Sequence, residues 1–500
     1  MVSQFGKEFN LDWSDKEAPK YSEFQKNLLK KCKKVTKLSE ITKTSEIIIN
    51  SQKFPIEFPI NTCRVEFQPK ERYEIIEEQI NSAYPIIHER VIWLYLRFLE
   101  HKIKYGNLTE KNVYSDMDLI DFVQRLLTKR CVSFFQRYDK YLLISKETGT
   151  NGHTTVGSLK EKSPLFLKNC LSYDEIKLSA LLSVSSHTEF INNGNRHNQG
   201  HVEKNKSEIE RSGVIIGLIG ARLVKRNFME AQDIIISDTQ NTKEHGYGKK
   251  DPSETGLKAT KNDYRQMWND FYNELDFIYN DVKVDNGRFH RLNANEIFDS
   301  IVMKKRYTIS FDTLLLDAAA RAFNEKKQAY IHVVGIGLGV WKCWKEQEKI
   351  FLATFAQRIK KLILKLNNIS IIHFSYFNND GFEEIKNGAI FHSDSHPNGG
   401  IKILVSKRNP HQKLHQPELE NYLPVISYAW DGNALPGNEF WLKHLKSTSD
   451  SAAACSTLIT ELHNPHINTK RVNANNLHIA SEEFGVLHIS EYAEKILKML

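Results

Sequence analysis

Ser183 to Asp238 reads SVSSHTEFINNGNRHNQGHVEKNKSEIERSGVIIGLIGARLVKRNFMEAQDIIISD, and it combines apolar strand-like segments with polar loops. The apolar segments 213–223 and 233–237 predict buried strands, because aliphatic and β-branched residues run through both. Glu230 stands just before the second segment, and a Val-Ser-Ser strand end lies upstream. Hydroxyls, amides, arginines and one carboxylate at strand ends predict a pocket for a polar, anionic ligand. The alternative interpretation is a Ser/Asn/Gly-rich loop that joins ordinary strands.

Length and composition limit the classes of protein to which the chain can belong. A chain of 500 residues with 40% hydrophobic and 26% charged residues predicts a soluble protein of more than one domain. It has no long apolar run and no hydrophobic signal region, so we expect no membrane span and a cytoplasmic protein. The six cysteines form no CxxC pair, which argues against zinc and disulfides, and we expect no metal. The +8 charge is thinly spread and not interleaved with aromatics, so we expect no nucleic-acid partner.

The residue pattern changes twice along the chain. Residues 1–125 carry apolar positions at helical spacing and predict a helical region. Residues 126–300 mix strand-like segments with polar loops, whereas residues 301–500 alternate helix and strand patterns, as in an α/β layered domain. The expected fold class is therefore α+β and α/β, in three domains with these bounds.

Three motifs of the middle region resemble the Arg–Ser–Glu arrangement of toxin-type mono-ADP-ribosyltransferases. FQRYD supplies Arg137, VSSHT supplies a strand end, and MEAQDIII places Glu230 before a strand. The match departs from the family at its middle motif, which is usually Ser-Thr-Ser, and at Phe228, where enzymes that modify arginine or asparagine have Glu or Gln. The blocks FQRYDKYLL, GNRHNQG, GLIGARL and QNTKEHGYG resemble an effector and eukaryotic family. At least one bacterial effector of that family ADP-ribosylates glutamate dehydrogenase.

The resemblance implies a split β-sheet domain over 126–300 that uses NAD as its substrate, with Glu230 as the catalytic residue. A carboxylate near the ribose hydroxyls can stabilise the oxocarbenium character that develops when the nicotinamide–ribose bond breaks. Cationic and hydroxyl side chains would then hold NAD, and the candidates are Arg137, Ser185, Ser186, His187, Thr188, Arg196 and Arg222.

The second half has a glycine-rich loop after a buried strand pattern. The strand pattern 329–334 runs into GIGLGVW, where glycine lets backbone N–H groups approach a phosphate. Its GxGxG spacing is not the dinucleotide-binding GxGxxG, so a dehydrogenase is disfavoured. Together with AWDGNALPGNEFW further on, this loop resembles a circularly permuted macrodomain, the ADP-ribose-binding fold, over roughly 310–465. Carried over, the ADP-ribose contacts would be Gly337, Leu338, Gly339, Trp341 and Asn433.

The sequence therefore predicts a mono-ADP-ribosyltransferase with a macrodomain-like C-terminal half that binds ADP-ribose. Its partner would be a protein substrate, for which a metabolic dehydrogenase is one candidate, and a bacterium could secrete it into a host cell without a cleaved signal peptide. The first alternative is a protein whose C-terminal half binds or hydrolyses ADP-ribose. The second is a non-catalytic interaction protein built on two decayed enzyme folds. The acceptor residue and the oligomeric state stay open.

Overall fold

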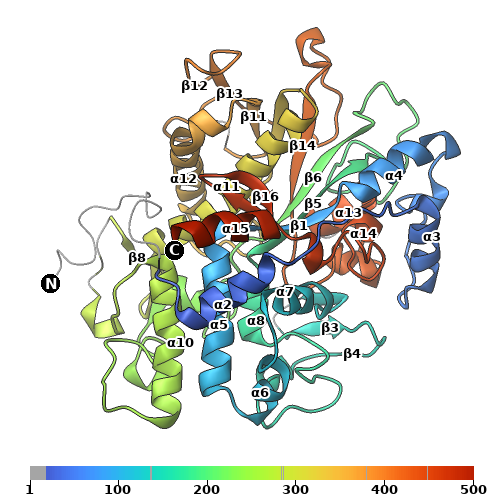
Figure 1. Ribbon diagram of the computed structural model, residues 1–500. Coiled ribbons are helices and arrows are strands. Elements are labelled where there is room, and N and C mark those ends of the chain that lie inside the picture. Colours follow the sequence, from blue (N-terminus) through green and yellow to red (C-terminus); the bar gives the residue numbers. More distant parts are fainter. Residues whose placement is uncertain (1–18, 136–137, 283, 285–286, 379, 447–448) are drawn as a thin grey trace.

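The computed structural model describes residues 19–135, 138–282, 284, 287–378, 380–446 and 449–500. Its central feature is a ten-stranded mixed sheet (Figure 1). From one edge to the other the strands are β12 (Ile390–His392), β13 (Gly400–Ser406), β11 (Ile369–Ser375), β10 (Ala329–Val333), β14 (Leu423–Ala429), β6 (Ser212–Leu218), β5 (Leu182–Glu189), β1 (Tyr84–His88), β15 (His478–Ser481) and β16 (Gly485–His488). Strands β13, β11, β10, β14 and β6 are parallel, whereas β5 runs antiparallel to both of its neighbours.

Helices cover both faces of this sheet. The long helix α11 (Ser300–Asn324) contacts seven strands of the sheet, while α4 (Tyr73–Asn81), α13 (Ser449–Ser456) and α14 (Ile459–Leu462) contact β5 and β14. Adjacent residues of β5 contact different helical layers, because side chains alternate between the two faces of a sheet along a strand. Ser185 donates a hydrogen bond to Asp317 of α11, whereas the Ser186 hydroxyl lies 2.9 Å from His463, just after α14. The apolar parallel strands are thus enclosed on both sides, as their sequences require.

The remaining helices and two small sheets surround this core. The helices are α2 (Glu23–Cys32), α3 (Thr44–Lys53), α5 (Glu89–Tyr105), α6 (Leu108–Tyr114), α7 (Leu119–Thr128), α8 (Tyr173–Ser179), α9 (Ala231–Ile234), α10 (Gly256–Tyr272), α12 (Gln347–Leu362) and α15 (Ile489–Met499). The small sheets are β2 (Ser133–Phe135), β3 (Lys140–Leu142) and β4 (Thr148–Gly149), and β7 (Ile235–Ser237), β9 (Glu296–Asp299) and β8 (Phe289–Arg291). Within the described residues, no helix is both long and apolar enough to cross a membrane.

The alternation of helix and strand predicted for the second half is confirmed. The predicted strands 329–334, 369–376 and 424–428 are β10, β11 and β14, with α11 and α12 where helices were expected. The predicted fold class is thus confirmed as far as a mixed α/β protein. Strands from 1–125, 126–300 and 301–500 all belong to the central sheet, and the division into three domains stays a prediction.

Two local expectations differ from the structure. The first concerns residues 71–104, where apolar positions at helical spacing predict helix that Pro85 breaks or kinks. A strand, β1, stands there instead between α4 and α5, and it contains Pro85. Ile86 and Ile87 are fully buried there, so their packing between β5 and β15 outweighs the helical spacing of their neighbours. The second is a split sheet belonging to 126–300. Strands β5 and β6 are instead inner strands of the ten-stranded sheet, because both are apolar and need a partner on each side.

Candidate active site

Three loops meet where the parallel strands end. Strands β10, β14 and β6 are neighbours in the sheet, and residues 334–341, 430–438 and 219–222 follow them directly. Because parallel strands end at the same edge of a sheet, these loops lie side by side along one carboxyl edge. Ligands of open α/β sheets bind at such an edge.

Two of the loops touch through glycines. A Cβ atom on Gly220 would lie 2.5 Å from the amide nitrogen of Gly337, so no side chain fits at Gly220. Gly337 also has a φ of +72°, a left-handed conformation that favours glycine. A Cβ atom on Gly339 would meet no heavy atom within 4 Å, so that position faces open space. Within the described part of the chain, the amides of Gly337, Gly339 and Val340 donate no hydrogen bond. Such backbone N–H groups around a glycine loop suit a phosphate.

The third loop holds a pair of carboxyl groups. Asp450, near the start of α13, accepts hydrogen bonds from the backbone amides of Asp431 (3.3 Å) and Gly437 (2.8 Å). Asp431 is partly exposed and accepts a short hydrogen bond from the side-chain amide of Asn438. Asp450 therefore fixes the shape of the loop, while Asp431 is the less buried of the two residues.

The pKa values of both carboxyl groups are raised above the ordinary range for aspartate. Burial raises the pKa of Asp431, while the bond from Asn438 and the charge of Arg222 oppose that shift. Burial, together with the negative charges of Asp431 and Glu439, raises the pKa of Asp450 further. A carboxyl group with a raised pKa is suited to exchange protons near neutral pH.

Asn438 ties this loop to strand β2. Its side-chain oxygen accepts hydrogen bonds from the Phe134 amide (2.9 Å) and the Ser133 hydroxyl (3.0 Å), and its side-chain nitrogen donates to Asp431. All of these groups are buried except Asp431. A buried amide with its donors and acceptor satisfied has one preferred orientation, so it positions the Asp431 carboxylate.

An arginine and a tryptophan complete the edge. The Arg222 guanidinium lies 5.3 Å from the Phe134 ring centroid and 5.9 Å from the Trp341 ring centroid. Its Nε atom is buried and has no hydrogen-bond partner within the described residues. Asn433 follows Asp431 in the same loop, and its side-chain nitrogen is likewise buried without a partner there. The structure thus brings together six of the predicted residues, which are Arg222, Gly337, Leu338, Gly339, Trp341 and Asn433.

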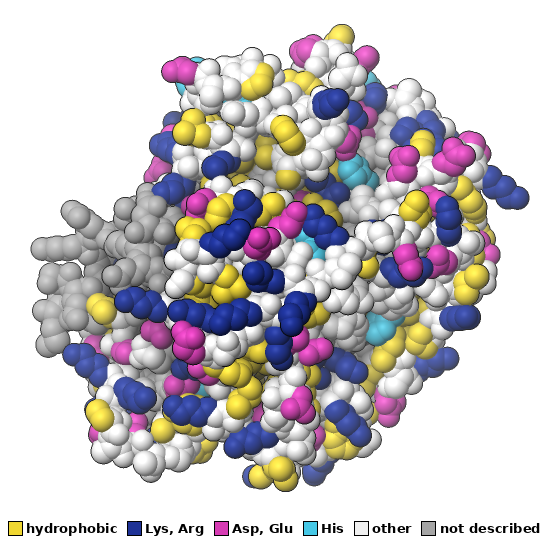
Figure 2. Space-filling model, in the orientation of Figure 1, with side chains coloured by type: hydrophobic (Ala, Val, Ile, Leu, Met, Phe, Trp, Pro, Cys, Tyr) yellow, Lys and Arg dark blue, Asp and Glu magenta, His cyan; other side chains and the backbone are white. Residues whose placement is uncertain are grey.

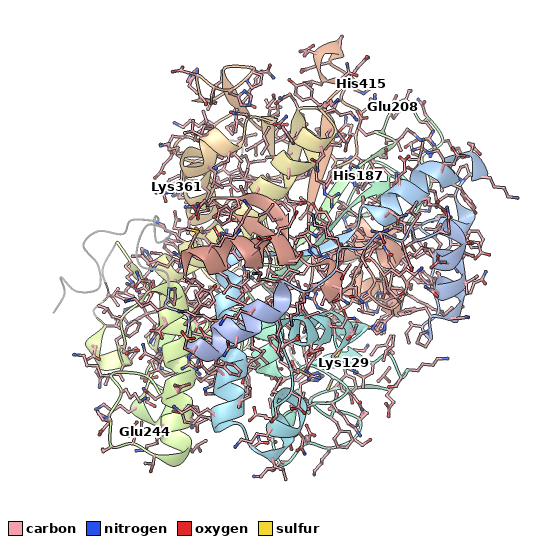
Figure 3. The ribbon with its side chains drawn as sticks, viewed as in Figure 1. Lys129, His187, Glu208, Glu244, Lys361 and His415 are labelled. Carbon is pink, nitrogen blue, oxygen red and sulfur yellow. The ribbon has the colours of Figure 1, made fainter. Side chains whose placement is uncertain are left out.

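The predicted Ser-Ser-His-Thr strand end lies elsewhere. Because β5 is antiparallel to β6, Ser185, Ser186, His187 and Thr188 lead away from the carboxyl edge. Their side chains pair with neighbouring elements: His187, labelled in Figure 3, lies 3.1 Å from Glu325, and Thr188 accepts from the amide of Leu458. Arg196 is exposed in the loop that follows β5. Arg137 lies outside the described residues.

Glu230 is a buried anchor beneath the 219–222 loop. It accepts a hydrogen bond from the Arg222 amide (3.2 Å) and ion-pairs with Arg306 (3.3 Å). Arg306 also donates to the backbone oxygens of Ile219 (2.8 Å) and Ala180 (3.0 Å). Burial raises the pKa of Glu230, and the Arg306 charge opposes that shift. These contacts hold the loop from behind, and only 2% of Glu230 is exposed.

The residues that sequence reasoning missed are Asp431, Asn438 and Asp450. The motif AWDGN, directly after a buried strand, was the available signal for Asp431. No local pattern links it to Asp450, which reaches it only through the packing of α13 against β14.

One group of described residues has the chemistry of metal ligands. The ligand atoms of His88, Asp312 and Glu482 lie within 4.8 Å of one another. Arg358 pairs with Asp312 at 2.7 Å and with Glu482 at 3.0 Å. Because the Arg358 guanidinium contacts both carboxylates, it competes with a metal ion for them. The predictions of NAD as substrate and of no metal stay untested.

Comparison with known proteins shows the family to which the chain belongs. The family described as ADP-ribosylhydrolase MavL-like matches residues 45–495. The chain belongs to this family. It is also 52% identical to ADP-ribosylarginine hydrolase CG2909 of Drosophila melanogaster, over 99% of each chain. It is 52% identical to ADP-ribosylarginine hydrolase CG3568 of the same organism, over 95% of this chain and 93% of the relative.

Membership of the MavL-like ADP-ribosylhydrolases corrects the predicted function. The resemblance to ADP-ribosyltransferase effectors was wrong, and so was the prediction of a transferase that would modify a host protein. The finding favours the first alternative, in which the chain hydrolyses ADP-ribose linkages. The catalytic assignment of Glu230 rested on the transferase reaction, and it loses that support. The predicted protein substrate holds in a coarser form, as an ADP-ribosylated protein.

Proposed function

We propose that the chain hydrolyses the bond between ADP-ribose and an arginine side chain, with Asp431 as the catalytic carboxylate. The observation that carries the proposal is the partly exposed Asp431, with its raised pKa, at the same edge as the 334–341 loop, whose free amides suit a phosphate. Two relatives at 52% identity are named ADP-ribosylarginine hydrolases. A guanidinium is also the group that carboxylates recognise best.

The ligand would lie along the carboxyl edge. Amides of the 334–341 loop would hold its diphosphate, and Arg222 would add a cationic donor through its free Nε atom. Tyr376 follows β11 at the same edge, is 60% exposed and offers a ring face for the adenine. The distal ribose would then reach the 430–438 loop, where Asp431 stands.

The reaction would break the bond between ribose C1″ and the arginine nitrogen. As that bond lengthens, positive charge develops on the ribose, and the Asp431 carboxylate stabilises it. Asp431 takes a proton from the water that attacks C1″, and the leaving guanidine receives that proton. The products are ADP-ribose and an unmodified arginine side chain. Asn438 and Asp450 would act through Asp431 by fixing its position.

A panel of linkages tests the proposal. Three peptides carrying ADP-ribose on arginine, serine or glutamate are incubated with the protein, and released ADP-ribose is quantified by mass spectrometry. Release from the arginine peptide at least tenfold faster than from the other two is expected. Equal release from all three would contradict arginine specificity, and release from the serine peptide alone would replace it.

A further inference from the structure

A cavity of about 430 Å³ lies between α5, α8 and α10 and the chain segment 227–247. None of its lining residues belongs to the three loops of the carboxyl edge. In Figure 3, Glu244 marks this region beside α10, far from His187 and β5. Its volume lies within the range of about 300–1,000 Å³ that small-molecule sites occupy.

A guanidinium with two nitrogen atoms unpartnered within the described chain lines this cavity. The Nε and Nη1 atoms of Arg265 on α10 are buried and have no hydrogen-bond partner among the described residues. Two aromatic rings lie beside it: the guanidinium is 4.5 Å from the Tyr247 ring centroid and 5.4 Å from that of Tyr264. Aromatic rings attract the charge but do not neutralise it. Buried donor atoms without a partner are costly, and an anionic ligand is the group that would accept hydrogen bonds from them.

The acidic groups of the cavity already have a cationic partner. Lys102 forms ion pairs with both Glu110 and Asp174, at 2.5 Å and 2.9 Å. Lys261, one turn before Arg265, donates to the backbone oxygen of Glu244 at 3.0 Å and brings a second positive charge to the α10 side. An anion would therefore sit against α10.

We propose that this cavity is a second ligand site, which takes a phosphate-bearing aromatic compound of mononucleotide size. Arg265 and Lys261 would bind the phosphate, because guanidinium and ammonium groups pair with it readily. The rings of Phe228, Tyr247 and Tyr264 line the same cavity and would flank the aromatic part of the ligand.

The site is connected to the carboxyl edge through one short segment. Phe228 lines the cavity, and its ring centroid lies 4.5 Å from that of Tyr173. It also lies two residues before Glu230. Glu230 holds the Arg222 amide of the 219–222 loop. A ligand against Phe228 would thus order the segment that supports the loop, which makes the cavity an effector site.

Binding of AMP, adenosine and inorganic phosphate tests the proposal by calorimetry. The protein carries Gly339→Val, which fills the open space at the glycine loop and leaves the second cavity untouched. AMP is expected to bind with a stoichiometry of one, and adenosine much more weakly. Adding Arg265→Gln should weaken AMP binding at least tenfold. Adding Lys258→Gln, an exposed charge on the same helix, should leave binding unchanged.

A second measurement follows the melting temperature, first of the free protein and then with AMP. Because the Nε and Nη1 atoms of Arg265 are buried without a hydrogen-bond partner among the described residues, Arg265→Gln should raise the melting temperature of the free protein. AMP should then stabilise only the protein that keeps Arg265. Absence of AMP binding to the Gly339→Val protein would overturn the proposal. Equal AMP affinity with and without Arg265→Gln would overturn it as well. So would a lower melting temperature of Arg265→Gln. Neither measurement involves hydrolysis, so failure of the proposed function would not mimic these outcomes.

Discussion

The backbone amide of Asp431 donates a hydrogen bond to the Asp450 carboxylate over 3.3 Å, so one acidic residue orients the loop that carries another. The second Asp450 oxygen accepts from the Gly437 amide at 2.8 Å, which closes the loop around a single side chain. The partly exposed Asp431 is thereby held at the carboxyl edge, where β10, β14 and β6 end together.

Asp450→Asn should weaken ADP-ribose binding and turnover together. An asparagine has one acceptor oxygen, so its NH₂ group must face the amide of either Asp431 or Gly437, and the loop loses a hydrogen bond worth about 1–3 kcal/mol. Binding can be measured by calorimetry and turnover by ADP-ribose release. Asp394→Asn, an exposed aspartate, is the matched control. Lost turnover with unchanged binding would make Asp450 a reacting group instead.

The rate should depend on pH through Asp431. Its pKa is raised, chiefly by burial, and the carboxylate form is the one that accepts a proton from water. At low pH the carboxyl group is protonated and inactive, so kcat/KM should rise with pH through a pKa above the usual value of about 3.9 for aspartate. A profile of kcat/KM between pH 4 and pH 9 checks this limb. A flat profile would exclude Asp431 as the base.

Gly339→Val should abolish ADP-ribose binding without unfolding the protein. A Cβ atom there meets nothing within 4 Å, so the new side chain occupies ligand space and not protein space. Gly339→Ala, with one methyl group, should have a smaller effect. Thermal melting serves as the check on folding, and affinity for ADP-ribose as the readout. If both variants bind as tightly as the native protein, the phosphate does not lie at this loop.

Glu230→Gln should cost stability more than activity. Glutamine can still accept from the Arg222 amide, but the buried Arg306 loses its charged partner. We expect the free energy of unfolding to fall by about 1–3 kcal/mol, and hydrolysis to fall less than tenfold. Urea unfolding and ADP-ribose release measure the two effects. Complete loss of hydrolysis in a fully stable variant would show that Glu230 takes part in the chemistry.

The glycine loop was predictable, because the apolar run of β10 directly precedes it and buried strands end in such turns. The direction of β5 was not. The direction of β5 depends on its pairing with β6 and β1. It decides whether Ser185 and Thr188 lead toward the carboxyl edge of the sheet or away from it. Asp431 was visible in AWDGN but had no marker of its own. Its chemistry depends on Asn438 and Asp450, whose side chains the fold brings to it.

The surface adds little to what the sequence already indicated. Lysine and arginine side chains are interspersed with acidic ones on the face shown in Figure 2, in line with the thinly spread charge of +8. A single dominant charged patch does not appear on that face.

The measurement that tests the central claim most directly compares the native protein with Asp431→Asn on a protein ADP-ribosylated at arginine. Release of ADP-ribose and affinity for free ADP-ribose are followed in parallel, with Asp394→Asn as the control. Release should fall by at least about 100-fold in Asp431→Asn, the range for loss of a general base, while affinity changes only a few fold. Unchanged release from Asp431→Asn would contradict the assignment of this carboxylate as the catalytic group.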